Sequence, residues 1–285
     1  MMVIQVSSAI SCNERTIANG SGQPACRSLV PRVCGMILIL SLCLLLTSAV
    51  VSAAEYRLSA ASADQFSGGI NYTGTDGLIL VIEDNVTIKG TGSTGIVSAS
   101  PITIRSPKGR TLTLFVDNDE EMLYGIKSPA VSLESGHLDI TVNGRNASGI
   151  SNAFGISAES GDVTISGGLV STLVETTCHK NKGIFASRYI VVSGGLVNVT
   201  QRGGSNTFGL DGGDEKNSNS GVRISGGRVL VNSAGALNRN IGIDSRSGTV
   251  EISGNTAVIV RIGESGARQN YAFNPNITTI DGAAW

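Results

Sequence analysis

Aromatic and charged residues are both scarce in this chain of 285 residues. Only 4% of the residues are aromatic and 15% are charged, whereas about a quarter are charged in an ordinary globular domain. The formal net charge is −1, so the chain lacks the basic field that attracts nucleic acids. Its basic residues are scattered and have no stacking aromatics beside them, and no nucleic-acid partner is expected.

Cysteine and histidine are too few to build a disulfide framework or a recognisable catalytic site. After residue 54 the only cysteine is Cys178, because the other four (Cys12, Cys26, Cys34 and Cys43) precede it. The two histidines, His137 and His179, lie far apart in the sequence. The chain has no Gly-x-Ser-x-Gly elbow, metal-binding histidine spacing or phosphate loop, and we assign no catalytic residue.

One long hydrophobic run stands near the N-terminus, at residues 36–53. Arg27 and Arg32 precede it, and the small residues Ser52, Ala53 and Ala54 end it. This order is typical of a secretory signal. We therefore expect residues 1–54 to be a leader cleaved near Ala54, and the protein to be secreted or at the cell surface. The alternative is an uncleaved anchor, since the run is long enough to span a bilayer, and this would be the only expected contact with a membrane.

Glycine is abundant, with 37 residues, and it recurs in two motifs that run in phase. Glycine followed by an aliphatic residue repeats every 26 to 33 residues, beginning at Gly95, Gly125, Gly155, Gly183, Gly209 and Gly242. The second motif is Ile-Ser-Gly-Gly or a close variant, beginning at Ile165, Val192, Ile224 and Ile252. An alternating apolar stretch follows each copy of the second motif, so each repeat holds three short apolar pieces of period two.

Such a repeat cannot bury its apolar face alone, but it can when stacked on its neighbours. The sequence predicts an all-β, single-stranded, right-handed parallel β-helix with three short strands per coil and roughly eight coils about 4.8 Å apart. We place a lead-in or cap at residues 55–75 and the β-helix domain at residues 76–285, with regular coils to about residue 273. A β-sandwich or a propeller is the alternative, although a propeller blade needs four strands.

The stacking predicts which residues share a column. Ile165, Val192, Ile224 and Ile252 should form one inward-facing column, and Ile156, Ile184, Leu210 and Ile243 another. The fourth motif position holds Gly168, Gly195, Gly227 and then Asn255, which predicts a positive φ there, because asparagine tolerates this conformation best after glycine. The motif serines either bridge successive coils through their hydroxyls or reflect the ordinary preference of serine for turns.

Two acidic segments depart from the regular coil. The interval from Gly209 to Ile224 is 15 residues, against 9 or 10 elsewhere, and the predicted protruding loop 211–220 contains Asp211, Asp214 and Glu215. The other segment contains Asp117, Asp119 and Glu121. Dense carboxylates and carbonyls in loops are the ligands that calcium prefers, so these six residues are the predicted metal ligands. The alternative is two solvated acidic turns, and the two segments lie in different coils.

At the repeated Ile-Ser-Gly-Gly motifs, with Gly-Ile in each coil, residues 66–273 resemble a known family. These are the secreted carbohydrate-binding parallel β-helix proteins of cellulosome-producing anaerobes, which bind polygalacturonate and are similar in fold to pectate lyases. The resemblance implies binding of an acidic plant polysaccharide, with calcium as cofactor and without established catalysis. No short ligand motif matches, so the resemblance assigns no calcium ligand to a particular residue.

We therefore predict a secreted, non-catalytic polysaccharide-binding module as the first function. The chain has one tryptophan, Trp285, and so lacks the aromatic platforms that usually bind neutral sugars, which favours an acidic polymer. A structural cell-surface protein or adhesin is the second hypothesis, because repeats alone suffice for it. A polysaccharide lyase or hydrolase is the third, with Arg188, Arg202 and Arg223 as candidate bases.

Overall fold

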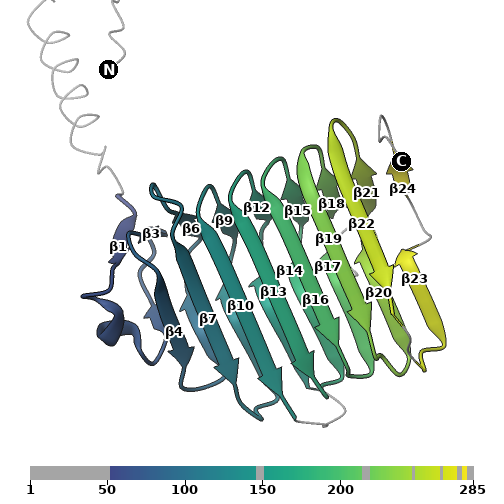
Figure 1. The fold of residues 1–285 in the computed structure, drawn as a ribbon, viewed down its shortest axis with the longest axis horizontal. Helices are drawn as coiled ribbons and strands as arrows, with labels where there is room; N and C mark the ends of the chain where they lie inside the picture. The colour runs from purple at the N-terminus through teal and green to yellow at the C-terminus, as the bar shows by residue number, and fades with distance from the viewer. Residues whose placement is uncertain are drawn as a thin grey trace, which may run out of the picture. The chain divides into compact units, whose positions relative to one another are not determined.

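Three parallel β-sheets make up the computed structural model, which describes residues 52–145, 151–213, 219–245, 248–263, 266–274 and 278–280. Each coil contributes one strand to each sheet, and successive coils pair strand to strand in parallel (Figure 1). The predicted all-β solenoid with three strands per coil is confirmed. None of the described residues forms a helix long and apolar enough to cross a membrane, and the predicted leader falls almost entirely outside them.

The first sheet contains, in spatial order, β1 (Ala54–Leu58), β3 (Leu78–Ile82), β6 (Ile102–Arg105), β9 (Val131–Leu133), β12 (Val163–Ile165), β15 (Tyr189–Val192), β18 (Gly221–Ile224), β21 (Thr249–Ile252) and β24 (Thr278–Ile280). The second sheet contains β4 (Val86–Gly90), β7 (Thr111–Asp117), β10 (His137–Gly144), β13 (Leu169–Thr176), β16 (Leu196–Arg202), β19 (Gly227–Ala234) and β22 (Thr256–Ile262). The third sheet contains β2 (Ile70–Tyr72), β5 (Thr94–Ser98), β8 (Met122–Ser128), β11 (Asn152–Ala158), β14 (Lys180–Ala186), β17 (Asn206–Gly212), β20 (Arg239–Asp244) and β23 (Gln269–Phe273).

Seven complete coils run from β3 to β23, close to the roughly eight that the repeat predicts. Residues 55–75, expected as a lead-in or cap, supply most of β1, a short 3₁₀ helix η1 (Ala63–Phe66) and β2. In this incomplete coil η1 lies beside β4, the end strand of the second sheet. Tyr56 stacks on Phe66 with ring centroids 5.8 Å apart and meets Tyr72 edge-on, so three aromatic rings cover this end of the core.

Both predicted columns are confirmed by the strand register. Ile165 is paired with Val192, Val192 with Ile224 and Ile224 with Ile252, and all four side chains are buried. The second column begins three coils earlier than predicted, at Ile70, and passes through Ile96 and Ile126. It continues through the four predicted members, Ile156, Ile184, Leu210 and Ile243. Because one residue per coil recurs at each place, the core is a set of continuous apolar stacks.

The glycine of each Gly-aliphatic pair is required by close packing across the core. A Cβ at Gly183 would overlap Val199 of the second sheet, and a Cβ at Gly209 would overlap Val231 in the next coil. Neither glycine is among those with a positive φ, so the motif reflects lack of space and not an unusual backbone conformation. The third sheet can approach the second sheet closely only because this position has no side chain.

The Gly-Gly turns follow the prediction in three coils, and the fourth turn differs in length. Gly168, Gly195 and Gly227 have φ values of 74°, 76° and 76°. In the last turn Gly254 has a positive φ, at 68°, whereas the positive φ expected at Asn255 stays a prediction. The turn is one residue longer there, because Gly227 is paired with Thr256.

The motif serines join successive coils mainly through their backbone. The amides of Ser193, Ser225 and Ser253 donate to carbonyl oxygens of the preceding coil at 2.8 to 2.9 Å. A side-chain bridge is present at Ser166, whose Oγ lies 3.4 Å from the carbonyl oxygen of Leu133. This pattern favours turn preference over a continuous column of bridging hydroxyls.

Candidate functional site: a cleft at the carboxyl ends of the second sheet

Four neighbouring strands of the second sheet carry a polar residue at the same place, near their carboxyl ends. Asn143 of β10 is paired with Asp117 of β7 on one side and with Glu175 of β13 on the other. Glu175 is in turn paired with Arg202 of β16. Parallel strands lie about 4.8 Å apart, so these side chains form a ladder with one rung per coil along the solenoid axis.

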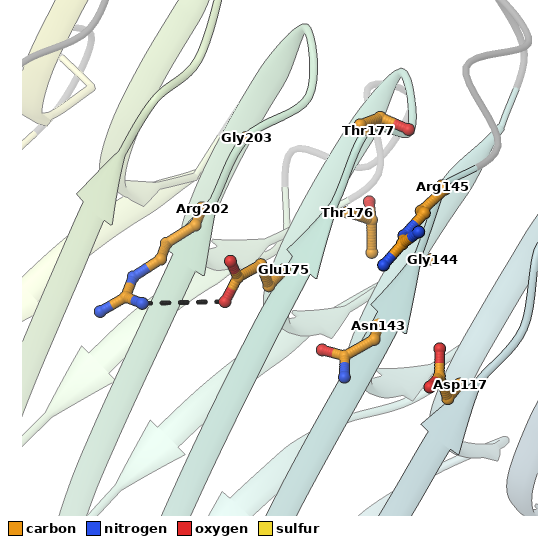
Figure 2. Close-up of a pocket in the computed structure, with 9 residues that line it drawn as sticks. All are labelled: Asp117, Asn143, Gly144, Arg145, Glu175, Thr176, Thr177, Arg202 and Gly203. Atoms are coloured by element: carbon orange, nitrogen blue, oxygen red, sulfur yellow. Dashed lines mark ion pairs between the residues drawn. The ribbon is translucent and has the colours of Figure 1, made fainter.

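The ladder borders a cleft of about 520 Å³. The cleft is lined by Asp117, Asn143, Gly144, Arg145, Glu175, Thr176, Thr177, Arg202 and Gly203. Figure 2 shows the side chains of Arg202 and Glu175 turned toward one another, and Arg145 lying across Gly144 toward Thr176. Two carboxylates, two guanidinium groups, an amide and the hydroxyl of Thr177 thus face one polar cleft that contains no aromatic ring, whereas the Thr176 side chain is buried beneath it.

The charged groups of the cleft are only weakly engaged with one another. Arg202 Nη1 lies 3.7 Å from Glu175 Oε2, and the two side chains are 61% and 53% exposed. An exposed pair at this distance contributes little to stability, so both groups can bind a ligand at small cost. Within the described part of the chain, Asp117 and Arg145 form no ion pair.

A buried amide holds the backbone of the cleft in place. Asn181 of β14 is fully buried, and its Nδ2 lies 3.1 Å from the carbonyl oxygens of Thr176, Arg202 and Gly203. Its Oδ1 accepts a hydrogen bond of 2.5 Å from Thr176 Oγ1. All three carbonyls belong to cleft residues, so Asn181 positions the ends of β13 and β16 from inside the solenoid.

Sequence reasoning missed Asn181, although a signal was present. Asn181 stands two residues before the Gly183 motif, where the two preceding coils have Leu123 and Ala153. The change from apolar to polar residues in this column could have been found by aligning the coils on their glycines. Sequence reasoning also missed Asn143 and Glu175 as partners of Asp117, since the three residues share no motif.

The three predicted ligands of the acidic segment before Gly125 lie in different surroundings. Asp117 enters the cleft, whereas Asp119 Oδ1 accepts a hydrogen bond of 2.8 Å from the backbone amide of Arg145. Glu121 is exposed, and its carbonyl oxygen accepts from the amide of Asn152. Asp117, Asp119 and Glu121 therefore do not converge, and no group of three or more metal-ligating side chains occurs among the described residues.

The prediction that Asp211 belongs to a protruding loop is wrong. Asp211 lies within β17 and is fully buried, and its Oδ2 is 2.8 Å from Lys182 Nζ on the neighbouring strand. Lys182 Nζ also lies 3.8 Å from the centre of the Phe185 ring. The strand continues to Gly212, and the lysine neutralises the buried carboxylate. Asp214 and Glu215, the other predicted ligands, lie outside the described residues.

The three candidate bases are in different surroundings. Arg188 Nε lies 3.8 Å from Asp162, and Arg223 Nε lies 3.2 Å from Glu251 while its guanidinium covers the Tyr189 ring at 4.0 Å. Of the three, Arg202 alone lines the cleft. Of the three arginines predicted as candidate bases, only Arg202 is therefore placed to act on a substrate bound in this cleft.

Comparison of this chain with models of protein families, with curated proteins and with solved structures found no match.

Proposed function

We propose that the protein is a secreted, non-catalytic binding module for an acidic polysaccharide, which lies along the solenoid axis in the cleft. The observation that carries the proposal is the in-register ladder of Asp117, Asn143, Glu175 and Arg202. A polymer of uronic acids presents carboxylate and hydroxyl groups at regular intervals comparable to the coil spacing. One side chain per coil can therefore meet successive sugar units.

The chemistry of the lining favours an anionic polymer. Arg145 and Arg202 present planar guanidinium groups, which bind carboxylates through two parallel hydrogen bonds. Asn143 and the hydroxyl of Thr177 can bond to sugar hydroxyls. No aromatic ring lines the cleft, so stacking of a neutral sugar has no platform there.

Calcium has a defined part in this proposal. Asp117 and Glu175 flank Asn143 in the ladder and repel a polymer of uronic acids unless a cation lies between them. Calcium takes several oxygen ligands in flexible geometry. It could therefore join these carboxylates and the side-chain amide oxygen of Asn143 to carboxylates of the polymer. The arginines should then bind the polymer in the absence of calcium, and calcium should make this binding stronger.

The test is electrophoresis of the purified protein through native gels that contain polygalacturonate, with calcium or with a chelator. We expect retardation, and we expect the double variant Arg145→Gln, Arg202→Gln to lose most of it. Arg110→Gln is the matched control, because Arg110 is exposed in a turn away from the cleft. Equal retardation of both variants would place the polymer elsewhere and contradict the proposal.

The calcium part is tested separately by Asp117→Asn combined with Glu175→Gln. This variant should lose the additional retardation that calcium causes. In chelator it should migrate at least as slowly as the unaltered protein, because two charges that repel the polymer have been removed. A calcium effect that survives in this variant would contradict the assignment of the ion to the cleft.

A lyase activity is the second candidate, because Arg202 lies in the cleft beside Glu175. The same polygalacturonate samples should be assayed for the absorbance of unsaturated sugar products. Product that disappears in Arg202→Gln would establish a lyase, whereas retardation without product supports the binding module. Absence of both would leave the structural protein or adhesin.

A further inference from the structure

A second hollow, unlike the cleft, lies on the outer face of the second sheet in the last three coils, over β16, β19 and β22. Its volume is about 260 Å³, and it is lined by Leu196, Asn198, Arg228, Val229, Leu230, Ala257, Ile259 and Arg261. Leu196 and Ile259 are 39% and 41% exposed and are among the few large apolar side chains that face solvent. We call this surface the apolar groove. Exposed apolar side chains gathered in one hollow are typical of a binding surface.

The charges around the apolar groove have one sign. Arg228 and Arg261 both line it, and no acidic residue does. Within the described residues neither arginine forms an ion pair, in contrast to Arg202 and Arg223, which lie near glutamates. Charged groups across an interface are usually complementary, so the occupant of this groove should be anionic at the positions that meet the arginines.

The spacing of the two arginines indicates the form of the occupant. Arg261 of β22 is paired with Asn232 of β19, which is four residues beyond Arg228 in the same strand. At about 3.3 Å per residue, the two arginines are separated by ~13 Å along the strand direction. Leu230 and Ile259 are paired with each other midway between them. The groove therefore presents cation, apolar surface and cation in a line along the strands.

An extended peptide has the matching pattern. Side chains at positions i, i+2 and i+4 of a β-strand project from one face and span the same ~13 Å. We propose that the apolar groove binds an extended segment of a partner protein that carries acidic, apolar and acidic residues at these three positions. The segment lies over β19 and β22 with its direction nearly aligned to theirs, as in sheet-on-sheet packing.

A second copy of this chain fits the groove less well. Two apolar grooves placed face to face would bring the arginines of one copy against those of the other, and like charges in a desolvated interface are strongly unfavourable. This proposal does not depend on polysaccharide binding, because it uses different residues on β19 and β22.

The experiment is fluorescence anisotropy of the full chain with a labelled peptide, Thr-Glu-Thr-Leu-Thr-Glu-Thr, at low salt. The expected result is saturable binding that weakens about two- to fivefold in each of Arg228→Gln and Arg261→Gln, the range of an exposed ion pair. Ile259→Thr should weaken it as well, and it keeps a β-branched residue at a position that is already half exposed. Arg239→Gln, an exposed arginine on β20, is the matched control and should bind as the unaltered chain does.

Two companion peptides make the result specific. In the peptide, replacement of both glutamates by glutamine should weaken binding about four- to twenty-fivefold, the product of the two single losses. Replacement of its leucine by serine should weaken binding as well. Equal binding of the glutamine peptide, or equal loss in Arg239→Gln, would overturn the proposal, because the charge at the groove would then play no part. Concentration-dependent dimerisation of the free protein that Ile259→Thr abolishes would also overturn it, since a second copy would then cover the groove.

Discussion

The earlier and later coils are built on the same backbone but have different interiors. One inward-facing column of the third sheet contains Leu123 and Ala153 in the earlier coils and Asn181, Thr207 and Asn240 in the later ones. All five residues are fully buried. The strand register passes from the apolar to the polar part of this column without interruption, so the solenoid template tolerates either kind of interior.

The facing column of the second sheet changes in the same direction. Val116, Val142 and Val174 are followed in register by Gln201 and Ser233. Thr207 Oγ1 lies 2.8 Å from both Ser233 Oγ and Asn240 Oδ1, so the two polar columns meet through hydrogen bonds. The later coils thus replace part of the apolar core with a hydrogen-bonded corner.

The difference shows what each kind of interior can do for the surface above it. Leu123 packs beneath Gly144, one wall of the cleft, where a Cβ would overlap the leucine side chain. Asn181 bonds directly to the carbonyls of three residues on the other wall. Apolar packing excludes water, whereas the amide also orients particular backbone groups, and this suits a wall lined by polar groups.

The largest effect is expected when a buried amide of the later coils is introduced at the equivalent position of an earlier coil. Leu123→Asn would bury an amide that lacks the partners found around Asn181, and would also remove packed carbon atoms. We expect the free energy of unfolding to fall by about 4 kcal/mol or more, since a cavity and unsatisfied polar atoms both contribute. Chemical denaturation measures this loss. A loss below ~1 kcal/mol would mean that the earlier coils accept polar interiors as readily as the later ones.

Removal of the amide from the later coil is the reciprocal test. Asn181→Ala leaves three carbonyl oxygens and Thr176 Oγ1 without this partner, and we expect a loss of about 2 to 3 kcal/mol. Because those groups form the cleft, retardation by polygalacturonate should also weaken. Ala153→Gly is a control for general destabilisation, since Ala153 occupies the same column one coil earlier. If both variants weakened binding equally at matched stability, Asn181 would have no specific positioning role.

The sequence predicted the repeated elements of this structure and missed those that depend on pairing between coils. Ile165 and Gly183 belong to motifs that recur along the chain, so alignment of the repeats was enough to place them in columns. Glu175 and Arg202 belong to no motif and meet only because β13 and β16 pair in a particular register. Asp211 was assigned to a loop from its glycine-rich and acidic neighbours, whereas its partner Lys182 lies 29 residues earlier on the adjacent strand.

Not every polar residue of the later interior is stabilising. Both side-chain polar atoms of Gln201 are buried, and neither has a hydrogen-bond partner among the described residues. Gln201→Val would restore the valine column of the earlier coils and remove this cost. We expect a gain of about 1 to 2 kcal/mol in the free energy of unfolding, measured by denaturation of the full chain. A loss of similar size would show that the buried amide is bonded in solution and contributes to the polar corner.

The outer face of the third sheet also differs between the earlier and the later coils, since aromatic residues are followed there by an ion pair. Tyr124 and Phe154 stack in the earlier coils with ring centroids 4.9 Å apart, and the next residue in register is Lys182, paired with Asp211. Burial, assisted by the nearby Glu159 carboxylate, raises the pKa of Tyr124 to about 12. Tyr124 thus loses its proton at a higher pH in the folded protein than in the unfolded chain, where the phenol is exposed to water. The contribution of Tyr124 to stability should be constant below pH ~10 and should be lost as the pH rises toward 12.

Tyr124→Phe keeps the aromatic stack and removes this ionisation. An alkaline titration followed by tyrosinate absorbance should show one late transition among the five tyrosines of the chain, absent from the variant. The variant should also lose less stability than the unaltered protein between pH 10 and 12, because its ring has no proton to release. A late transition that persists in Tyr124→Phe would assign it to another tyrosine and would contradict the burial of this ring as its cause.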